Sequence, residues 1–301
     1  MKPKLFFWCI LFFSFTTCSS EREPDKVTAI AGFSDRANSQ INTFLDSVKN
    51  LEQRKIAVFD GDGTVLGQVP HYLADECLYK YALKNPNRKP QVIEEMKNQS
   101  NVSLAYVQNR INYLSGHTLE DVRAMGADCF DHYYTDKIFQ PMKSLINLLK
   151  NNNFEIWIVT ASPESMYQKF LSQAFSLPIT NIIGVKSIIR NGLITDEIVH
   201  PVPQDKGKKE AIETFIQGIP LLVAGNSRGD KEMIEHSAGI KMIVNPDEHI
   251  AHDQVESIAA YADRHNWVIV RINDMINENF PAVSSKQYGI RKNKVRFYQG
   301  N

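Results

Sequence analysis

Two aspartates, one residue apart and directly after a short apolar run, constrain this chain more than any other feature. Residues 56–59 are Ile-Ala-Val-Phe, the pattern of a buried strand, and Asp60 and Asp62 follow it. Because residues i and i+2 of an extended chain point to the same side, both carboxylates can face one site. Gly61 and Gly63 allow a sharp turn close to a bound group. Crowded carboxylates repel each other, so the pattern favours a cation or a shared proton, and an aspartate placed there can act as a nucleophile.

A second apolar run ends in hydroxyl side chains. Residues 154–159 predict a strand that ends at Thr160 and Ser162, with Pro163 in the first turn of a helix. A turn from a strand into a helix offers a hydroxyl and unpaired backbone N–H groups, which together bind phosphate oxygens. This turn is therefore a candidate phosphate site.

Two later segments continue the series. Residues 205–216 place apolar side chains at helical spacing, with Lys206 and Lys208 at the start of the predicted helix. A later apolar run, Leu-Leu-Val-Ala-Gly, is followed by Asn226 and Asp230. Amide and carboxylate oxygens are ligands that Mg²⁺ accepts. Four polar segments thus follow one another, each at a strand end or a helix start.

In this order, the four segments resemble the signature motifs of the haloacid dehalogenase superfamily, which begin with Asp-x-Asp-x-Thr, here residues 60–64. The resemblance implies that Asp60 is the nucleophile. It also implies that Asp62 is the acid–base group, because phosphatases of the superfamily have an acid at this second position. The phosphate-binding residues that it implies are Thr160 and Lys208, with Ser162 and Lys206 as the alternatives.

The resemblance further implies a bound Mg²⁺ ion. The ligands that it implies are the carboxylate of Asp60, the carbonyl of Asp62, the side chain of Asn226 and the nearby Asp230. Asn226 departs from the family pattern, which has an aspartate there, and an amide oxygen can bind Mg²⁺ but brings no charge. The implied reaction is a two-step phosphoryl transfer through an aspartyl-phosphate. Hydrolysis, transfer to an alcohol and ligand binding by an inactive relative all stay open.

Strands and helices alternate along most of the chain. The predicted strands lie near 55–59, 154–160, 220–224, 239–243 and 267–272, and the predicted helices near 140–152, 163–174, 207–217, 229–237 and 252–265. This alternation predicts an α/β fold with a Rossmann-like parallel sheet and helices on both faces. Open sheets of this kind bind ligands at the carboxyl ends of their strands, where the four motifs should meet.

Residues 66–138 lack strand-like runs and predict four helices, near 70–84, 91–98, 102–115 and 118–134. In the superfamily, a helical insertion after the first strand is a cap that closes over a small substrate and excludes water. The predicted organisation is therefore a catalytic core of residues 38–65 and 139–275 with a cap of residues 66–138 inserted in it.

The cap segment just after the first motif carries the candidate substrate contacts. The motifs and the cap resemble the subgroup of phosphoserine and phosphorylcholine phosphatases, which implies a small phosphorylated substrate. A carboxylate such as Asp75 or Glu76 would meet a cationic head group, and Tyr72 would add a cation–π contact. The full set of candidates is Gln68, His71, Tyr72, Asp75, Glu76 and Ser162.

Residues 1–18 have the pattern of an export signal. Two lysines precede an apolar run that is about half as long as a membrane-spanning helix needs, and Cys18 follows. This resembles the lipobox of bacterial lipoproteins, which implies a lipid on Cys18 and a position on the periplasmic side of a bacterial membrane. Cleavage to a soluble exported protein is the alternative. Residues 19–37 predict a tether and residues 276–301 a C-terminal tail.

The charge balance argues against nucleic acid as a partner. The chain has 34 basic and 34 acidic residues, whereas a surface that binds nucleic acid is strongly basic. Two of its cysteines, Cys77 and Cys129, lie within the predicted cap, and an oxidising compartment would permit a disulfide between them. Substrate identity and oligomeric state stay open.

Overall fold

The computed structural model describes residues 29–69, 71–250, 252 and 254–274. The predicted export signal, the lipid on Cys18 and the C-terminal tail lie outside these residues. Among the helices described, none is both long and apolar enough to cross a membrane.

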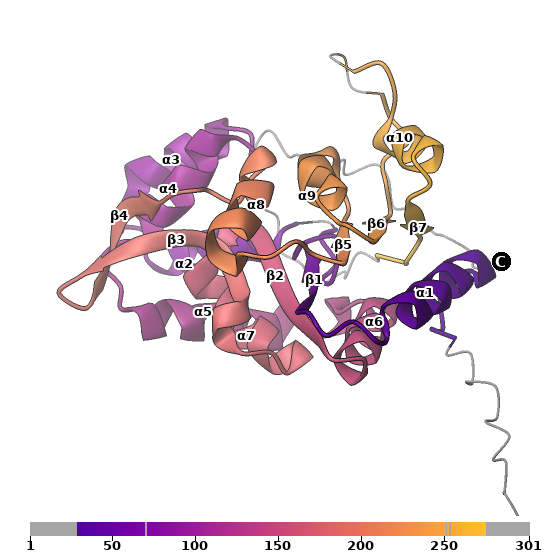
Figure 1. Ribbon diagram of the computed structural model, residues 1–301. Coiled ribbons are helices and arrows are strands. Elements are labelled where there is room, and N and C mark those ends of the chain that lie inside the picture. The colour runs from indigo at the N-terminus through magenta and orange to yellow at the C-terminus, as the bar shows by residue number, and fades with distance from the viewer. Residues whose placement is uncertain (1–28, 70, 251, 253, 275–301) are drawn as a thin grey trace, which may run out of the picture.

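A seven-stranded sheet forms the centre of the molecule, with the strand order β4-β3-β2-β1-β5-β6-β7 (Figure 1). The strands are β1 (Lys55–Phe59), β2 (Phe154–Pro163), β3 (Ile182–Arg190), β4 (Leu193–Val199), β5 (Leu222–Gly225), β6 (Ile240–Val244) and β7 (Val268–Val270). Neighbouring strands pair in parallel, except that β3 and β4 are antiparallel. The predicted α/β class is confirmed.

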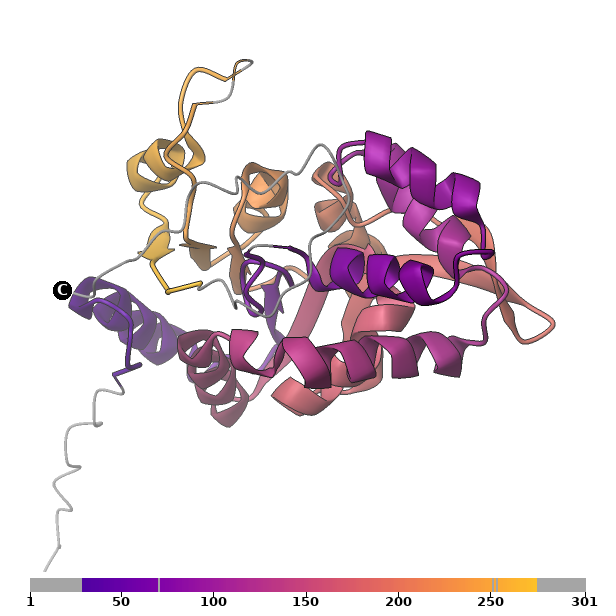
Figure 2. The same cartoon turned by 180° about the vertical axis from the view of Figure 1, so that it is seen from behind.

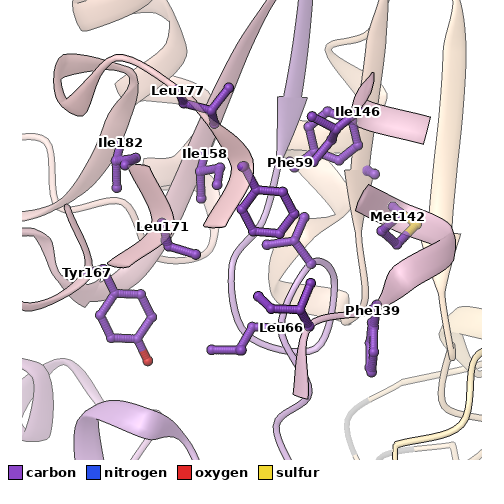
Figure 3. Packing of buried hydrophobic residues seen from close by; sticks show 14 of the residues in the cluster. Phe59, Leu66, Phe139, Met142, Ile146, Ile158, Tyr167, Leu171, Leu177 and Ile182 are labelled. Atoms are coloured by element: carbon purple, nitrogen blue, oxygen red, sulfur yellow. The ribbon is translucent and has the colours of Figure 1, made fainter. Parts of the chain in front are cut away.

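Helices cover both faces of this sheet (Figure 1). One face carries α1 (Asp35–Val48), α6 (Gln140–Asn151) and α7 (Glu164–Phe175), and the other carries α8 (Lys206–Ala211), α9 (Lys231–Glu235) and α10 (Ile258–Arg264). Strand β1 serves both layers, because Ala57 and Phe59 pack in the first apolar cluster and Ile56 and Val58 in the second. Figure 3 shows Phe59 within the first cluster. A strand that is buried on both faces reads as a continuous apolar run, which is why β1 is evident in the sequence.

Four of the helices between β1 and β2 gather at one end of the molecule (Figure 2). They are α2 (Leu73–Lys84), α3 (Pro90–Asn98), α4 (Leu104–Leu114) and α5 (Leu119–Tyr133), and together they form the cap. A disulfide between Cys77 and Cys129 joins α2 to α5. The helical insertion expected between the first two motifs is therefore present and is cross-linked within itself.

The cap packs against the core at two places. Helix α5 lies on α7, where the rings of Phe130 and Phe170 stack with centroids 4.8 Å apart. A Cβ at Gly126 would lie 1.9 Å from the carbonyl oxygen of Met166, so this close approach requires glycine. At the second place, the segment after α4 bonds to β4, with Gly116 N–H donating to the carbonyl of Ile194 at 2.8 Å. The cap therefore rests on α7 and on the β3–β4 hairpin.

Three features correct the sequence-based expectation. The β3–β4 hairpin was not predicted, although its turn is Asn191-Gly192, with φ of 51° and 78°, the strongest short hairpin signal. The predicted tether ends earlier than residue 37, because Ile30 and Phe33 are already buried in the core and α1 begins at Asp35. The last helix begins at residue 258 rather than 252, with Ser257 as its N-cap.

Candidate active site

Asp60 lies at the carboxyl end of β1, and its backbone N–H donates to the carbonyl of Ala224 in β5 at 2.9 Å. The Nζ of Lys208, from α8, lies 2.6 Å from Asp60 Oδ1 and 2.5 Å from Asp230 Oδ1. Burial raises the pKa of Asp60 to about 7, although Lys208 opposes the shift. One ammonium is therefore shared by two buried carboxylates and does not fully neutralise them.

Asp62 lies two residues further along, but hydroxyl groups rather than a cation hold it. The hydroxyl of Ser162, from the end of β2, donates to Oδ2 at 2.9 Å. The hydroxyl of Tyr167, from α7, lies 2.9 Å from both Oδ1 and Oδ2. Burial raises the pKa of Asp62 to about 6, against the two hydroxyl donors, which lower it. This carboxyl group can therefore change its protonation state near neutral pH.

Asp230 anchors the loop that follows β5. Its Oδ2 accepts the backbone N–H groups of Asn226 at 3.0 Å and Ser227 at 2.9 Å, and also the Ser227 hydroxyl at 3.0 Å. Although burial favours its neutral form, Lys208 and these donors hold the pKa of Asp230 below its usual value. Asp230 thus remains ionised and fixes both Lys208 and the loop.

Only one orientation of the Asn226 amide satisfies its neighbours. In that orientation Nδ2 donates to Asp60 Oδ2 and Asp230 Oδ2, both at 3.2 Å, and Oδ1 accepts from Gln68 Nε2 at 3.1 Å. Gly63 makes room for this contact: its φ is 85°, and a Cβ there would lie 2.6 Å from Asn226 Cγ and 2.7 Å from Gln68 Cδ. The second glycine of the first motif is thus required where two later site residues meet.

A cavity of about 680 Å³ opens onto these groups. It brings together most of the residues that the sequence singled out, from the ends of β1, β2 and β5, the start of α8 and the segment that leads into α2. Those that line it are Asp60, Asp62, Gln68, Tyr72, Thr160, Ser162, Lys208 and Asn226. Thr160 lies close to the first motif, because its Oγ1 is 3.2 Å from where a Cβ at Gly61 would be.

Other candidates lie elsewhere, which corrects their predicted place. Asp75 and Glu76 sit in the first turn of α2 and do not line the cavity. Asp75 Oδ1 binds Arg110 Nη2 at 2.7 Å, and Glu76 Oε1 lies 3.5 Å from Lys80 Nζ. His71 is buried and does not line the cavity either. Lys206, the alternative to Lys208, is also outside it: its side chain is 82% exposed and faces Glu210 across 3.9 Å.

Two residues that sequence reasoning missed are part of the site. Arg110, from α4, is 3% exposed and lines the cavity, while Tyr167 reaches Asp62 from α7. Neither belongs to a motif, and each looks like an ordinary member of an amphipathic helix. Their roles depend on which helices meet, which no local pattern reports.

The comparisons with known proteins agree with this geometry. The family model of haloacid dehalogenase-like hydrolases matches residues 57–235, more than half of the chain. This chain belongs to that family. The match spans all four motifs, from Asp60 to Asp230, and it includes the whole cap of this hydrolase.

Individual relatives of the hydrolase are distant. Phosphoserine phosphatase SerB1 of Mycobacterium tuberculosis is 23% identical over 156 residues, covering 50% of this chain and 49% of the relative. The chain thus spans about half the length of the curated relatives that it matches. A functionally unknown protein of Anaerococcus prevotii has a TM-score of 0.62 and 14% identity, over 88% of this chain and 98% of the other. One of unknown function from Bordetella pertussis has a TM-score of 0.57 and 15% identity, over 72% and 98%. At these identities the two structures show the fold alone.

The donor atoms of the hydrolase fit a hard metal ion. Within the described ranges, no three His, Cys, Asp or Glu side chains form a group that could hold a metal by themselves. However, the carboxylates of Asp60 and Asp62 line one cavity, and the ammonium of Lys208 lies between Asp60 and the buried carboxylate of Asp230. Such an oxygen-rich, negatively charged site suits Mg²⁺, which takes few protein ligands and keeps waters. Asn226 Oδ1 would bind the ion only after its amide turns away from Gln68.

Proposed function

We propose that this hydrolase is a Mg²⁺-dependent phosphomonoesterase that works through an aspartyl-phosphate on Asp60. The observation that carries the proposal is the contrast between two buried carboxylates at one end of the cavity. Asp60 shares an ammonium, whereas Asp62 is held by hydroxyl groups. The first arrangement suits a nucleophile that receives a phosphoryl group, and the second suits a group that gives and takes a proton.

The reaction follows from these two roles. In the first step an oxygen of Asp60 attacks phosphorus, the bond from phosphorus to the ester oxygen breaks, and Asp62 gives its proton to that oxygen. In the second step Asp62 takes a proton from water, the water oxygen attacks phosphorus, and Asp60 is released together with inorganic phosphate. Lys208 neutralises the phosphoryl group and Thr160 donates to it. When bound, Mg²⁺ supplies further electrostatic stabilisation of the phosphoryl oxygens.

The cap points to the kind of substrate. Arg110 lines the cavity, and its Nε and Nη2 bind Asp75 at 2.9 Å and 2.7 Å. Among the described residues, its Nη1 has no acceptor. A guanidinium that faces a ligand cavity is suited to a carboxylate or a second phosphate. We therefore favour a small phosphate ester that carries another anionic group over the cationic head group expected from Asp75 and Glu76. The partial match to a protein named phosphoserine phosphatase supports this choice.

The test compares three phosphate esters whose second group is a carboxylate, a quaternary ammonium or absent. Wild type should hydrolyse the carboxylate-bearing ester with the highest kcat/KM. Arg110→Ala should raise KM for that ester about tenfold or more, and change the KM of the uncharged ester little. Glu76→Gln is the matched control, because it alters a buried cap charge outside the cavity. A preference for the ammonium ester in wild type would contradict the proposal, and an equal loss on all three esters would assign Arg110 to the packing of the cap.

Hydrolysis and transfer are separated by their products. Release of inorganic phosphate equal to the alcohol released, in the presence of added glycerol, supports hydrolysis. A shortfall of inorganic phosphate that matches newly formed glycerol phosphate would instead make the protein a phosphotransferase with the same Asp60 intermediate.

We also propose that the protein is exported and carries a lipid on Cys18. The disulfide between Cys77 and Cys129 supports export, because such bonds persist in oxidising compartments. Metabolic labelling with a radioactive fatty acid should mark the wild type but not Cys18→Ala, and the wild type should fractionate with membranes. Wild-type protein that takes up no radioactive fatty acid and is found in the soluble exported fraction would favour simple cleavage of the signal.

A further inference from the structure

Tyr167 lies outside the cavity but touches the group that the proposed reaction uses as its acid. It sits in α7, its side chain is fully buried, and its ring packs beside Phe170 with centroids 5.1 Å apart. Figure 3 shows the ring at the border of the apolar cluster with its hydroxyl oxygen pointing away from it. The residue does not line the cavity, so it does not reach a bound substrate directly.

The hydroxyl of Tyr167 has partners from different parts of the fold. It donates to the Asp62 carboxylate, whose two oxygens lie equally close at 2.9 Å. It also accepts the backbone N–H of Ala74 at 3.2 Å. Ala74 is in the first turn of α2, where N–H groups have no partner within the helix, and the N-cap residue Tyr72 makes no side-chain cap bond there. One oxygen atom thus links the cap to Asp62.

We propose that Tyr167 is a positioning residue: it holds Asp62 in place for proton transfer to the leaving group, and it ties that placement to the docked position of α2. This inference rests on the proposed function. Asp62 begins the first step neutral and ends it as a carboxylate. A hydroxyl donor to that oxygen pair strengthens when the charge forms, because charge-assisted hydrogen bonds are about twice as strong as neutral ones. The N–H of Ala74 polarises the hydroxyl in the same sense.

The consequence is a dependence on the leaving group. An alkoxide leaves poorly without a proton, so alkyl phosphates need Asp62 in place. A nitrophenolate leaves readily and needs little protonation. The hydroxyl of Ser162 also donates to Asp62, at 2.9 Å. Without the Tyr167 hydroxyl, Asp62 should therefore keep one hydrogen bond but shift from the position that suits proton transfer.

Tyr167→Phe removes only the hydroxyl oxygen and keeps the packed ring. We expect kcat to fall about tenfold or more for alkyl phosphates but less than about threefold for nitrophenyl phosphate. A plot of log kcat against the pKa of the leaving group should become steeper. Tyr134→Phe is the matched control, because it removes a buried hydroxyl that donates to the carbonyl of His71 at 2.9 Å without a bond to Asp62. Tyr134→Phe should lower the unfolding midpoint but leave the slope of log kcat against the leaving-group pKa unchanged.

The outcomes separate this inference from the proposed function. An equal loss of kcat on all esters, or an unchanged slope, would overturn the role of Tyr167 while leaving Asp60 as the nucleophile. If the wild type hydrolysed no ester, the proposed function would fall, and a second measurement would decide on the contact itself. The shifts in unfolding midpoint of Tyr167→Phe and Asp62→Ala should then fail to add in the double variant. Additive shifts would overturn the coupling.

Discussion

The two sides of the active site are built from different parts of the fold. As a result, two aspartates that are two residues apart have different surroundings and suit different chemical roles. On the side of Asp60, core elements β5 and α8 supply a backbone carbonyl and an ammonium. On the side of Asp62, the end of β2 and helix α7 supply hydroxyl groups, and the cap contributes a backbone N–H that donates to one of those hydroxyl groups. A two-residue step along the chain therefore changes the chemistry completely. The lesson is that a carboxylate takes its role from the elements that meet around it.

Removing the nucleophile should have the largest effect. Asp60→Asn keeps the shape of the side chain and an oxygen toward Lys208 but cannot form an acyl-phosphate, so kcat should fall by at least about 10⁴-fold. The measurement is phosphate release under single-turnover conditions, with circular dichroism to confirm the fold. Activity within a few-fold of wild type would remove Asp60 from the nucleophile's role and break the contrast between the two sides.

The ammonium should matter to stability as well as to rate. Lys208→Met leaves Asp60 and Asp230 buried without a cation, so the free energy of unfolding should fall by about 3–5 kcal/mol at pH 7. In addition, kcat should fall by about 10²–10³-fold, because the phosphoryl charge loses its partner. Lys206→Met is the control: this lysine is exposed and 3.9 Å from Glu210, so neither quantity should change measurably. Similar effects of the two variants would argue that Lys208 is not the neutralising group.

The parts of the molecule that could be predicted from the sequence are those with local causes. Buried parallel strands are continuous apolar runs, and polar residues at their ends meet by topology alone, so Asp60, Thr160 and Asn226 were located without the structure. Arg110 and Tyr167 were not, because their helices carry no signal of what they face. The candidates Asp75 and Glu76 show the converse error: nearness in sequence to the first motif was taken as nearness to the cavity, whereas the first turn of α2 directs both toward other cap residues.

The hairpin was missed for a different reason. Its Asn191-Gly192 turn was visible, but β4 is an edge strand that is half exposed and carries charged residues, so its apolar pattern is weak. The cap needs this hairpin as a support for α4. The sequence therefore contained a local signal for the turn, but not the packing of the hairpin against the cap.

Asn226 tests the metal on the side of Asp60. Asn226→Ala removes a candidate ligand, and the Mg²⁺ concentration for half-maximal rate should rise about tenfold or more. Asn226→Asp adds a charge beside Asp60 and Asp230, so the same concentration should fall, although without Mg²⁺ the variant should unfold more easily because two hydrogen-bond donations are lost. Titration of the rate with Mg²⁺ after chelation measures both. An unchanged titration in both variants would exclude Asn226 from the metal shell.

The last expected effect is a pH dependence of stability to which the two sides contribute differently. In the folded protein the pKa values of Asp60 and Asp62 are raised from 3.8 to about 7 and about 6. The folded state therefore binds more protons than the unfolded state between pH 4 and those values, and stability falls as the pH rises through this window. In the presence of a chelator these two shifts together correspond to a loss of about 4 kcal/mol between pH 5 and pH 8, at about 1.4 kcal/mol per pKa unit. Asp60→Asn should reduce the slope above about pH 6, where the carboxyl group of Glu76, whose pKa burial raises to about 7, also contributes. Asp62→Asn should mainly flatten the part below it.

Added Mg²⁺ sharpens the comparison, because a bound cation favours the ionised form of Asp60. It should flatten the upper part of the slope in wild type and in Asp62→Asn, which keep this carboxyl group, but not in Asp60→Asn. Urea unfolding at a series of pH values, with and without Mg²⁺, measures all of these slopes. If Asp60→Asn and wild type had the same slope above pH 6 in chelator, the shared ammonium of Lys208 would be enough to neutralise Asp60. The claim that one ammonium does not fully neutralise Asp60 and Asp230 would then be refuted.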